Sequence, residues 1–327
     1  CGRAGRPQYD DEGESIIVAK GSPDELLEWY VDGKPEPLES QILGDISLRI
    51  NLLSVIATLS TFSPVSEEKI NEFFSQTFGG LSDDKLEDKI SKRLKELKEF
   101  GMITDEDGFK PTTFGKKVFW LRIDPKTAFD VTAYLEDHVK GNKHTFGFLH
   151  MITNLPEFYP QFSITDKHQN TMEEIHDNFK HEKLYAYQKL NKDWTKSLLI
   201  LHHWINDTST DYLEREFGAQ PGDMYNLTRN AGQLAYVVRE IARYWKYEVL
   251  VDELDILRQR IRHGVSEKYL DLITIKNVGR IRVKILYKSG FHDRADLRKA
   301  TLGKLSAIDK IGMTVAKSIK SQIEKVR

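Results

Sequence analysis

Two arginines near the start of the chain are the first residues whose type and spacing suggest chemistry. Arg3 and Arg6 stand three residues apart, and each directly follows a glycine, Gly2 or Gly5. In a short helical turn this spacing brings two guanidinium groups to one side. Guanidinium is planar and always charged, so the pair suits contact with a terminal phosphate as charge builds on it during transfer. Two arginines alone are equally compatible with a loop that has no such role.

A repeated pattern near the end of the chain supplies the second group of candidates. The segments TIKNVGRIRVKILYKSGF and SAIDKIGMTVAKSIKSQI each place a glycine, Gly279 or Gly312, before apolar residues at helical spacing. The repeat predicts two helix-hairpin-helix units. Glycine suits such hairpins because the chain turns with little room and its backbone N–H groups approach a phosphate at the start of the second helix. Phosphate contacts are therefore predicted at and around the first hairpin, for Lys276, Gly279, Arg280, Arg282 and Lys284.

Both hairpins depart from the fuller GxG pattern at its first glycine. Asn277 stands there in the first unit and Lys310 in the second. Asparagine tolerates a left-handed backbone better than lysine does. The first hairpin is therefore predicted to bind DNA and the second to be structural.

A long helix is predicted in PGDMYNLTRNAGQLAYVVREIARYW, from Asp223 to about Trp245. Apolar residues recur there in steps of three and four, so one stripe should be buried along six turns. The opposite face carries Asn226, Arg229 and Gln233 and is nearly free of acids. Such a face could track a phosphate backbone, although long helices usually only carry a bundle.

Charge is distributed unevenly along the 327 residues, whose net charge is −2. Residues 258–327 contain 18 lysines and arginines against 6 acids. A basic C-terminal module on an acidic remainder suggests a polyanionic partner. A single cysteine and the absence of an apolar run of about 20 residues exclude a disulfide framework and a membrane span, and fit an intracellular protein.

Several catalytic patterns are missing from the sequence. There is no HExxH, His168, His176 and His181 do not share a helical face, and the adjacent His202 and His203 point to different sides, so no metal site is predicted. There is no GxxxxGK[ST] either, so the chain has no phosphate cradle of its own. The apolar strand at residues 15–20 lacks a sheet within the chain, which predicts that the sheet lies upstream of Cys1 and that the sequence is a fragment.

These candidates require a mainly α framework in four parts. Residues 1–41 form a tail with one strand, and residues 42–123 form a winged helix of three helices and a hairpin within 102–119. In that winged helix the third helix, 86–100, carries acids among its lysines, which favours packing over DNA reading. Residues 124–263 are helical throughout, and residues 264–327 hold the two hairpins.

The opening segment GRAGRPQYDDEGESIIVAK resembles motif VI, and the strand after it, of superfamily 2 helicases. The resemblance continues through YVDGKPEPLESQI, the winged helix, the PGDM helix and the RHGV segment before the hairpins. It covers essentially the whole chain and is best for the archaeal DNA helicase group related to HelQ.

This resemblance implies an ATP-dependent enzyme that moves 3′ to 5′ on single-stranded DNA and unwinds branched or stalled-fork substrates. Residues 1–41 would be the tail of the second RecA-like domain. Arg3 and Arg6 would act as arginine fingers, with Gly2 and Gly5 beside the nucleotide. The P-loop and the Mg²⁺ ligands would lie on missing N-terminal RecA-like domains, so this chain alone should not hydrolyse ATP.

The resemblance also implies that the PGDM helix is a ratchet that grips unpaired bases, and here the chain departs from the family. Where the family commonly has arginine and, seven residues later, tryptophan, this sequence has Asn226 and Gln233. Glutamine cannot stack as an aromatic ring does. Gripping should then shift to hydrogen bonding, with Arg229 supplying the charge.

Two alternatives stay open on the sequence alone. One is an RNA-remodelling helicase of the superkiller or spliceosomal type, and the other is a non-enzymatic DNA-binding protein built on the winged helix and the hairpins. Under the favoured reading the partners are single-stranded and forked DNA, with replication-fork or single-strand-binding proteins as further candidates. A monomer in the archaeal cytosol, associated with the nucleoid, is expected.

Overall fold

The computed structural model describes residues 38–139, 144–160 and 192–324, together with residues 22–31 and several single positions. The chain divides into two compact units, Cys1–Ile42 and Leu43–Arg327. In the first unit the described part contains helix α1, Pro23–Tyr30, which opens on a proline and two acids. Gly2, Arg3, Gly5 and Arg6 lie outside the described residues, as do alternate residues of the predicted strand at 15–20.

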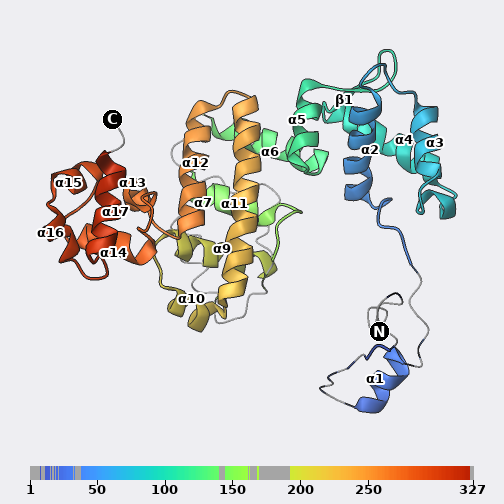
Figure 1. Cartoon of the computed structure of the whole chain (residues 1–327). Helices are drawn as coiled ribbons and strands as arrows, with labels where there is room; N and C mark the ends of the chain where they lie inside the picture. Colours follow the sequence, from blue (N-terminus) through green and yellow to red (C-terminus); the bar gives the residue numbers. More distant parts are fainter. Residues whose placement is uncertain are drawn as a thin grey trace. The chain divides into compact units, whose positions relative to one another are not determined.

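The second unit begins with helices around a short hairpin (Figure 1). Its elements are α2 (Asp45–Leu59), α3 (Glu67–Ser75), the 3-10 helix η1 (Gly80–Ser82), α4 (Leu86–Glu99), β1 (Ile103–Thr104), β2 (Lys110–Pro111) and α5 (Thr113–Leu121). The two strands pair antiparallel, with Ile103 opposite Pro111. The hairpin is thus shorter than predicted, and its expected second half is the helix α5.

Helix α5 forms because its N-terminus is capped. The Thr112 hydroxyl accepts a hydrogen bond from the Gly115 N–H at 2.9 Å, which satisfies one of the free amides of the first turn. Phe114 and Val118 then fall on one buried face. The alternation of TTFGKKVF, interpreted as a strand, was a misreading of this helical face.

A buried ion pair joins α2 to the N-terminus of helix α6, Pro125–His138. Arg49 donates through Nε and Nη2 to the two carboxylate oxygens of Asp124 at 2.8 and 2.6 Å, and through Nη1 to Glu96 on α4 at 3.3 Å. The Asp124 carboxylate raises the pKa of the Arg49 guanidinium by hydrogen bonding to it. Asp124 also caps α6, so one carboxylate links two helical regions.

The middle of the chain is a helical bundle. Its helices are α6 (Pro125–His138), α7 (Thr145–Asn154), α9 (Lys192–Ile205), α10 (Thr210–Phe217), α11 (Pro221–Tyr244) and α12 (Glu248–His263). Helix α11 has 24 residues and starts at Pro221, where the Gln220 N–H donates to the Asp223 carboxylate at 3.1 Å. Six of the seven residues predicted for its apolar stripe are buried: Met224, Leu227, Ala231, Leu234, Val238 and Ile241. The seventh, Trp245, is 40% exposed.

The end of α11 contacts α5. The Tyr244 hydroxyl lies 2.8 Å from the Thr113 hydroxyl, and Phe114 packs on Tyr244 at 5.0 Å between ring centroids. Close by, the buried Glu240 carboxylate accepts from Lys117 at 2.5 Å. These contacts anchor the C-terminal end of α11 to α5. They leave the N-terminal half of α11 out of this contact.

The last part of the chain packs around its own apolar core. Its elements are η3 (Glu267–Tyr269), α13 (Leu270–Ile273), α14 (Arg280–Lys288), α15 (Arg294–Lys299), α16 (Leu302–Ser306) and α17 (Met313–Glu324). The described residues are overwhelmingly helical, as predicted. No helix in the described ranges is long and apolar enough to cross a membrane.

The last turn of helix α9 contains two adjacent histidines, His202 and His203. The His202 ring lies edge-on against Phe146 at 5.5 Å. Burial, helped by the nearby His203 and Arg260, lowers the pKa of His202 from 6.5 to about 4. The unfolded chain therefore takes up a proton near pH 6.5, whereas the folded chain does so only near pH 4. The free energy of unfolding therefore decreases as the pH falls from about 6.5 toward 4.

We expect the free energy of unfolding to drop by about 2 kcal/mol between pH 7 and pH 5 on account of His202. Urea titrations across this pH range, followed by circular dichroism, measure it. His202→Gln should remove this part of the dependence. The remainder comes from His144, His203 and His263, whose pKa values burial also lowers, and from Glu157, whose pKa burial raises. Equal pH profiles for the wild type and His202→Gln would contradict the assignment.

Candidate nucleic-acid interface

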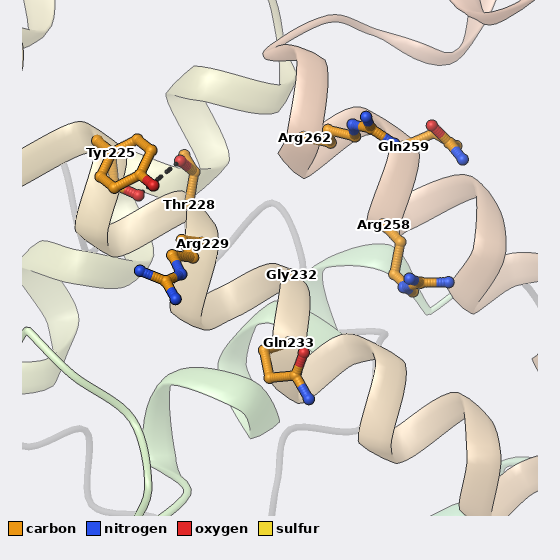
Figure 2. A pocket seen from close by; sticks show the side chains of 8 residues that line it. All are labelled: Tyr225, Thr228, Arg229, Gly232, Gln233, Arg258, Gln259 and Arg262. Carbon is orange, nitrogen blue, oxygen red and sulfur yellow. Dashed lines mark hydrogen bonds between the residues drawn. The ribbon is translucent and has the colours of Figure 1, made fainter.

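A polar groove runs between α11 and α12 (Figure 2). It has a volume of about 360 Å³. Its lining comes from both helices: Tyr225, Thr228, Arg229, Gly232 and Gln233 on α11, and Arg258, Gln259 and Arg262 on α12. Three guanidinium groups line the groove, and no acid does so among the described residues, so its chemistry suits an anion such as a phosphate backbone.

The spacing of the lining residues follows from helix geometry. On α11 they recur in steps of three and four, the interval that keeps side chains on one face. At Gly232 an added Cβ would meet only the Ile261 side chain of α12, at 4.0 Å. A small residue here leaves the groove open between the two helices.

The three arginines are held differently. Arg258 is half-buried, lies 5.0 Å from the Tyr236 ring and donates to Asp255 at 3.2 Å. Arg229 and Arg262 are exposed. Figure 2 shows the Arg229 side chain extending away from α11 and the Arg262 side chain on α12 beside Gln259. They are therefore the two guanidiniums best placed to meet a ligand.

A second hollow continues the groove toward the first hairpin. It shares Gln259 and Arg262 with the groove and has a volume of about 500 Å³. Its remaining lining consists of His263, the segment 273–279 and Arg282. A continuous polar path therefore runs from α11 over α12 to the hairpin.

Both hairpins adopt the left-handed backbone at the position of the replaced glycine. The φ angle is 70° at Asn277 and 60° at Lys310. Arg282 fixes both, because its Nη1 donates to the Asn277 carbonyl at 2.9 Å and its Nε to the Lys310 carbonyl at 2.8 Å. Lysine at the second hairpin thus has not changed the backbone, contrary to the reasoning that set the two hairpins apart.

Gly279 needs a different explanation from the one predicted. Its backbone is extended, with φ of −85°, and a Cβ built there would meet nothing within 4 Å. The tight turn is made by Asn277 instead. Gly279 is the N-cap of α14, and its missing side chain leaves the amides of that helix open to a close ligand.

Arg280 and Lys284 lie elsewhere than predicted. The Arg280 guanidinium stacks on Trp204 at 4.1 Å and donates to the carbonyls of Gly264, at 2.6 Å, and Thr208. Lys284 donates to the Asp207 carbonyl at 2.7 Å. Burial lowers the pKa of both side chains. They tie the hairpin domain to the α9–α10 connection, and the structure does not place them on the groove.

The other predicted residues are distributed as follows. Arg229 and Gln233 line the groove, while Lys276, Gly279 and Arg282 line the second hollow. Asn226 is exposed on α11 but does not contribute to the groove lining. The sequence reasoning missed Tyr225 and the α12 residues. Arg258 and Arg262, spaced by four, were a usable signal, but they had been counted only as part of the basic C-terminal charge.

Metal and nucleotide sites are not part of this interface. In the described ranges no group of three or more histidine, cysteine or acidic residues could hold a metal ion. The residues expected to contact ATP lie outside the described part of the chain.

Comparison with known proteins shows similarity to archaeal helicases. Residues 146–264, which contain the groove, match the family described as archaeal helicase, domain 4. The chain is 33% identical to the ATP-dependent DNA helicase Hel308 of Pyrococcus abyssi and 32% identical to that of Pyrococcus horikoshii, each over 97% of its length. Over this length the chain is similar to archaeal ATP-dependent DNA helicases. It spans 45% of the length of each of these two relatives.

Similarity to the archaeal helicases agrees with the mainly α fold and with the resemblance found from the motifs. A further relative, the Hel308 of Thermoplasma acidophilum, is 32% identical over 97% of this chain. The matches do not favour an RNA-remodelling helicase or a stand-alone binding protein. The four domain boundaries and the roles of individual residues stay predictions.

Proposed function

We propose that this chain is the strand-holding part of an ATP-dependent helicase that moves 3′ to 5′ on single-stranded DNA and opens branched or stalled-fork substrates. The observation that supports the proposal most directly is the arginine-lined groove, continuous with the first hairpin. Phosphate contacts from Arg229, Arg262 and the α14 amides would hold the strand without reading its sequence. The parent enzyme would work in the archaeal cytosol at the nucleoid.

The nucleotide chemistry would require the rest of the parent protein. Arg3 and Arg6, with Gly2 and Gly5, would complete an ATP and Mg²⁺ site whose phosphate cradle lies on another domain. When bound there, ATP supplies the energy for strand movement. The 327-residue chain is therefore proposed to bind DNA without hydrolysing ATP. Sequencing the gene upstream of Cys1 for a Walker A lysine and a DExH box tests this part directly.

Binding of a fluorescein-labelled dT₂₀ oligonucleotide, followed by anisotropy, tests the strand-holding role. We expect affinity to fall steeply with salt, with a slope of log K against log salt of about −0.7 for each phosphate contacted. With three to five contacts the slope lies between about −2 and −3.5. Ribonucleotide strands of equal length should compete less well. A slope near zero, or stronger competition by RNA, would contradict the proposal.

A further inference from the structure

A further pocket, distinct from the hollow beside the first hairpin, adjoins the groove at Tyr225. It shares Tyr225 and Thr228 with the groove and has a volume of about 290 Å³. The rest of its lining comes from α9, α10, the connection that follows α10 and the start of α11: Trp204, Thr210, Glu214, Ala219, Pro221 and Met224. Tyr225 and Thr228 of α11 are thus the two residues that line both the arginine groove and this pocket.

The walls of the pocket suit a flat apolar group. Met224 and Ala219 are buried, and Tyr225 leaves 64% of its surface exposed at the boundary with the groove. Trp204 is fixed in place, because its Nε1–H donates to the Ile261 carbonyl at 2.7 Å and Arg280 stacks on its ring. Tyr225 therefore supplies the exposed ring of the pocket, and aromatic rings bind unpaired bases by stacking, whatever the base.

The polar groups of the pocket are mostly hydrogen-bond acceptors. The Thr228 hydroxyl donates its proton to the Met224 carbonyl at 2.6 Å, which leaves its oxygen as an acceptor. The exposed Glu214 carboxylate accepts one bond, from Gln220 at 3.1 Å, and keeps further acceptor capacity. Among the described lining residues none is basic, so the pocket disfavours a phosphate and favours a group that donates N–H bonds.

We propose that this pocket binds one nucleobase turned out of the strand in the groove, and that Glu214 makes guanine the preferred base. Guanine is the base that presents two adjacent N–H donors, at N1 and N2, to a single carboxylate. Adenine has the same size but offers an acceptor, N1, beside its one amino group. This proposal rests on the proposed strand-holding function and adds a base preference to it.

Oligonucleotides that differ at a single base measure this preference. The 327-residue chain is titrated into labelled dT₂₀ strands with one central guanine, adenine or inosine, and binding is followed by anisotropy. The protein can bind at any position along a thymine strand. It can therefore bind where the central base lies next to the pocket. We expect the guanine strand to bind about five- to tenfold more tightly than the adenine strand, with inosine, which lacks the N2 amine, between them.

Two variants and a control assign the effect to the pocket. Glu214→Gln should abolish the guanine preference while leaving binding of plain dT₂₀ equal or tighter, since a negative charge is removed. Tyr225→Leu should weaken all strands by removing the stacking face. Glu99→Gln, at an exposed position on α4, should change neither quantity. Normal salt-dependent dT₂₀ binding with no base preference would overturn the pocket alone, whereas no dT₂₀ binding would overturn the strand-holding function as well.

Discussion

Replacing Arg262 by alanine is expected to weaken binding of single-stranded DNA by about ten- to thirtyfold. Arg262 is exposed and is one of two residues that line both the groove and the hollow beside the first hairpin. A strand that follows this path must pass it wherever it lies in the groove. The loss should be uniform across sequences and should reduce the salt slope by about 0.7, as one phosphate contact is lost. Anisotropy titrations of dT₂₀ at several salt concentrations measure both quantities.

Two control variants separate the contact from general charge. Gln233→Ala removes a neutral side chain of the same groove and should leave the salt slope unchanged. Lys95→Ala removes a positive charge at an exposed position on α4 and should have little effect on affinity. If Arg262→Ala and Lys95→Ala weaken binding equally, the groove is not the path of the strand.

The sequence predicted those features that depend on neighbours along the chain. The stripe of α11 was predictable because its seven apolar positions repeat every three or four residues, and six of them are buried on one face. The two hairpins were predictable because the glycine and the apolar spacing around it recur in both units. Left-handed backbone at Asn277 agrees with the prediction, whereas left-handed backbone at Lys310 was not predicted.

Side-chain partners that lie far apart in sequence were not predictable. Arg280 looked like a phosphate ligand because it begins α14 beside Gly279. Its actual partner, Trp204, is 76 positions earlier and is brought close only by the packing of α9 against α12. The same limit applies to the groove, where Arg262 acquires its significance by facing α11. Local sequence patterns predict which side of a helix is buried. Which residues contact that side depends on the tertiary fold.

The junction around Trp204 explains how the hairpin is held beside the groove. Gly264 ends α12 and Asp207 follows α9, and both have positive φ angles, of 64° and 71°. The Asp207 carboxylate accepts from the Ser266 N–H at 3.0 Å and from its hydroxyl at 2.7 Å. With Arg280 on Trp204, these bonds fix the chain as it leaves α12. The position of the first hairpin therefore depends on a close backbone approach at Gly264.

Gly264→Ala is accordingly expected to lower the free energy of unfolding by about 3 kcal/mol or more. The new Cβ would lie 2.4 Å from two carbons of the Trp204 ring, Cε2 and Cζ2. The ring cannot easily yield, because the Ile261 carbonyl and the Arg280 guanidinium hold it. Left-handed backbone at alanine adds its own strain. Urea titration and calorimetric melting of the chain measure the loss.

Gly218→Ala is the matched control. Gly218 ends α10 with φ of 65°, almost the angle of Gly264, but a Cβ there would meet nothing within 4 Å. Its cost should be the backbone strain alone, about 1 kcal/mol. The difference between the two variants isolates the contact with Trp204. At temperatures where both variants stay folded, only Gly264→Ala should also weaken dT₂₀ binding, because only that substitution displaces the hairpin from the groove. Equal losses of binding in both variants would mean that the junction does not position the hairpin.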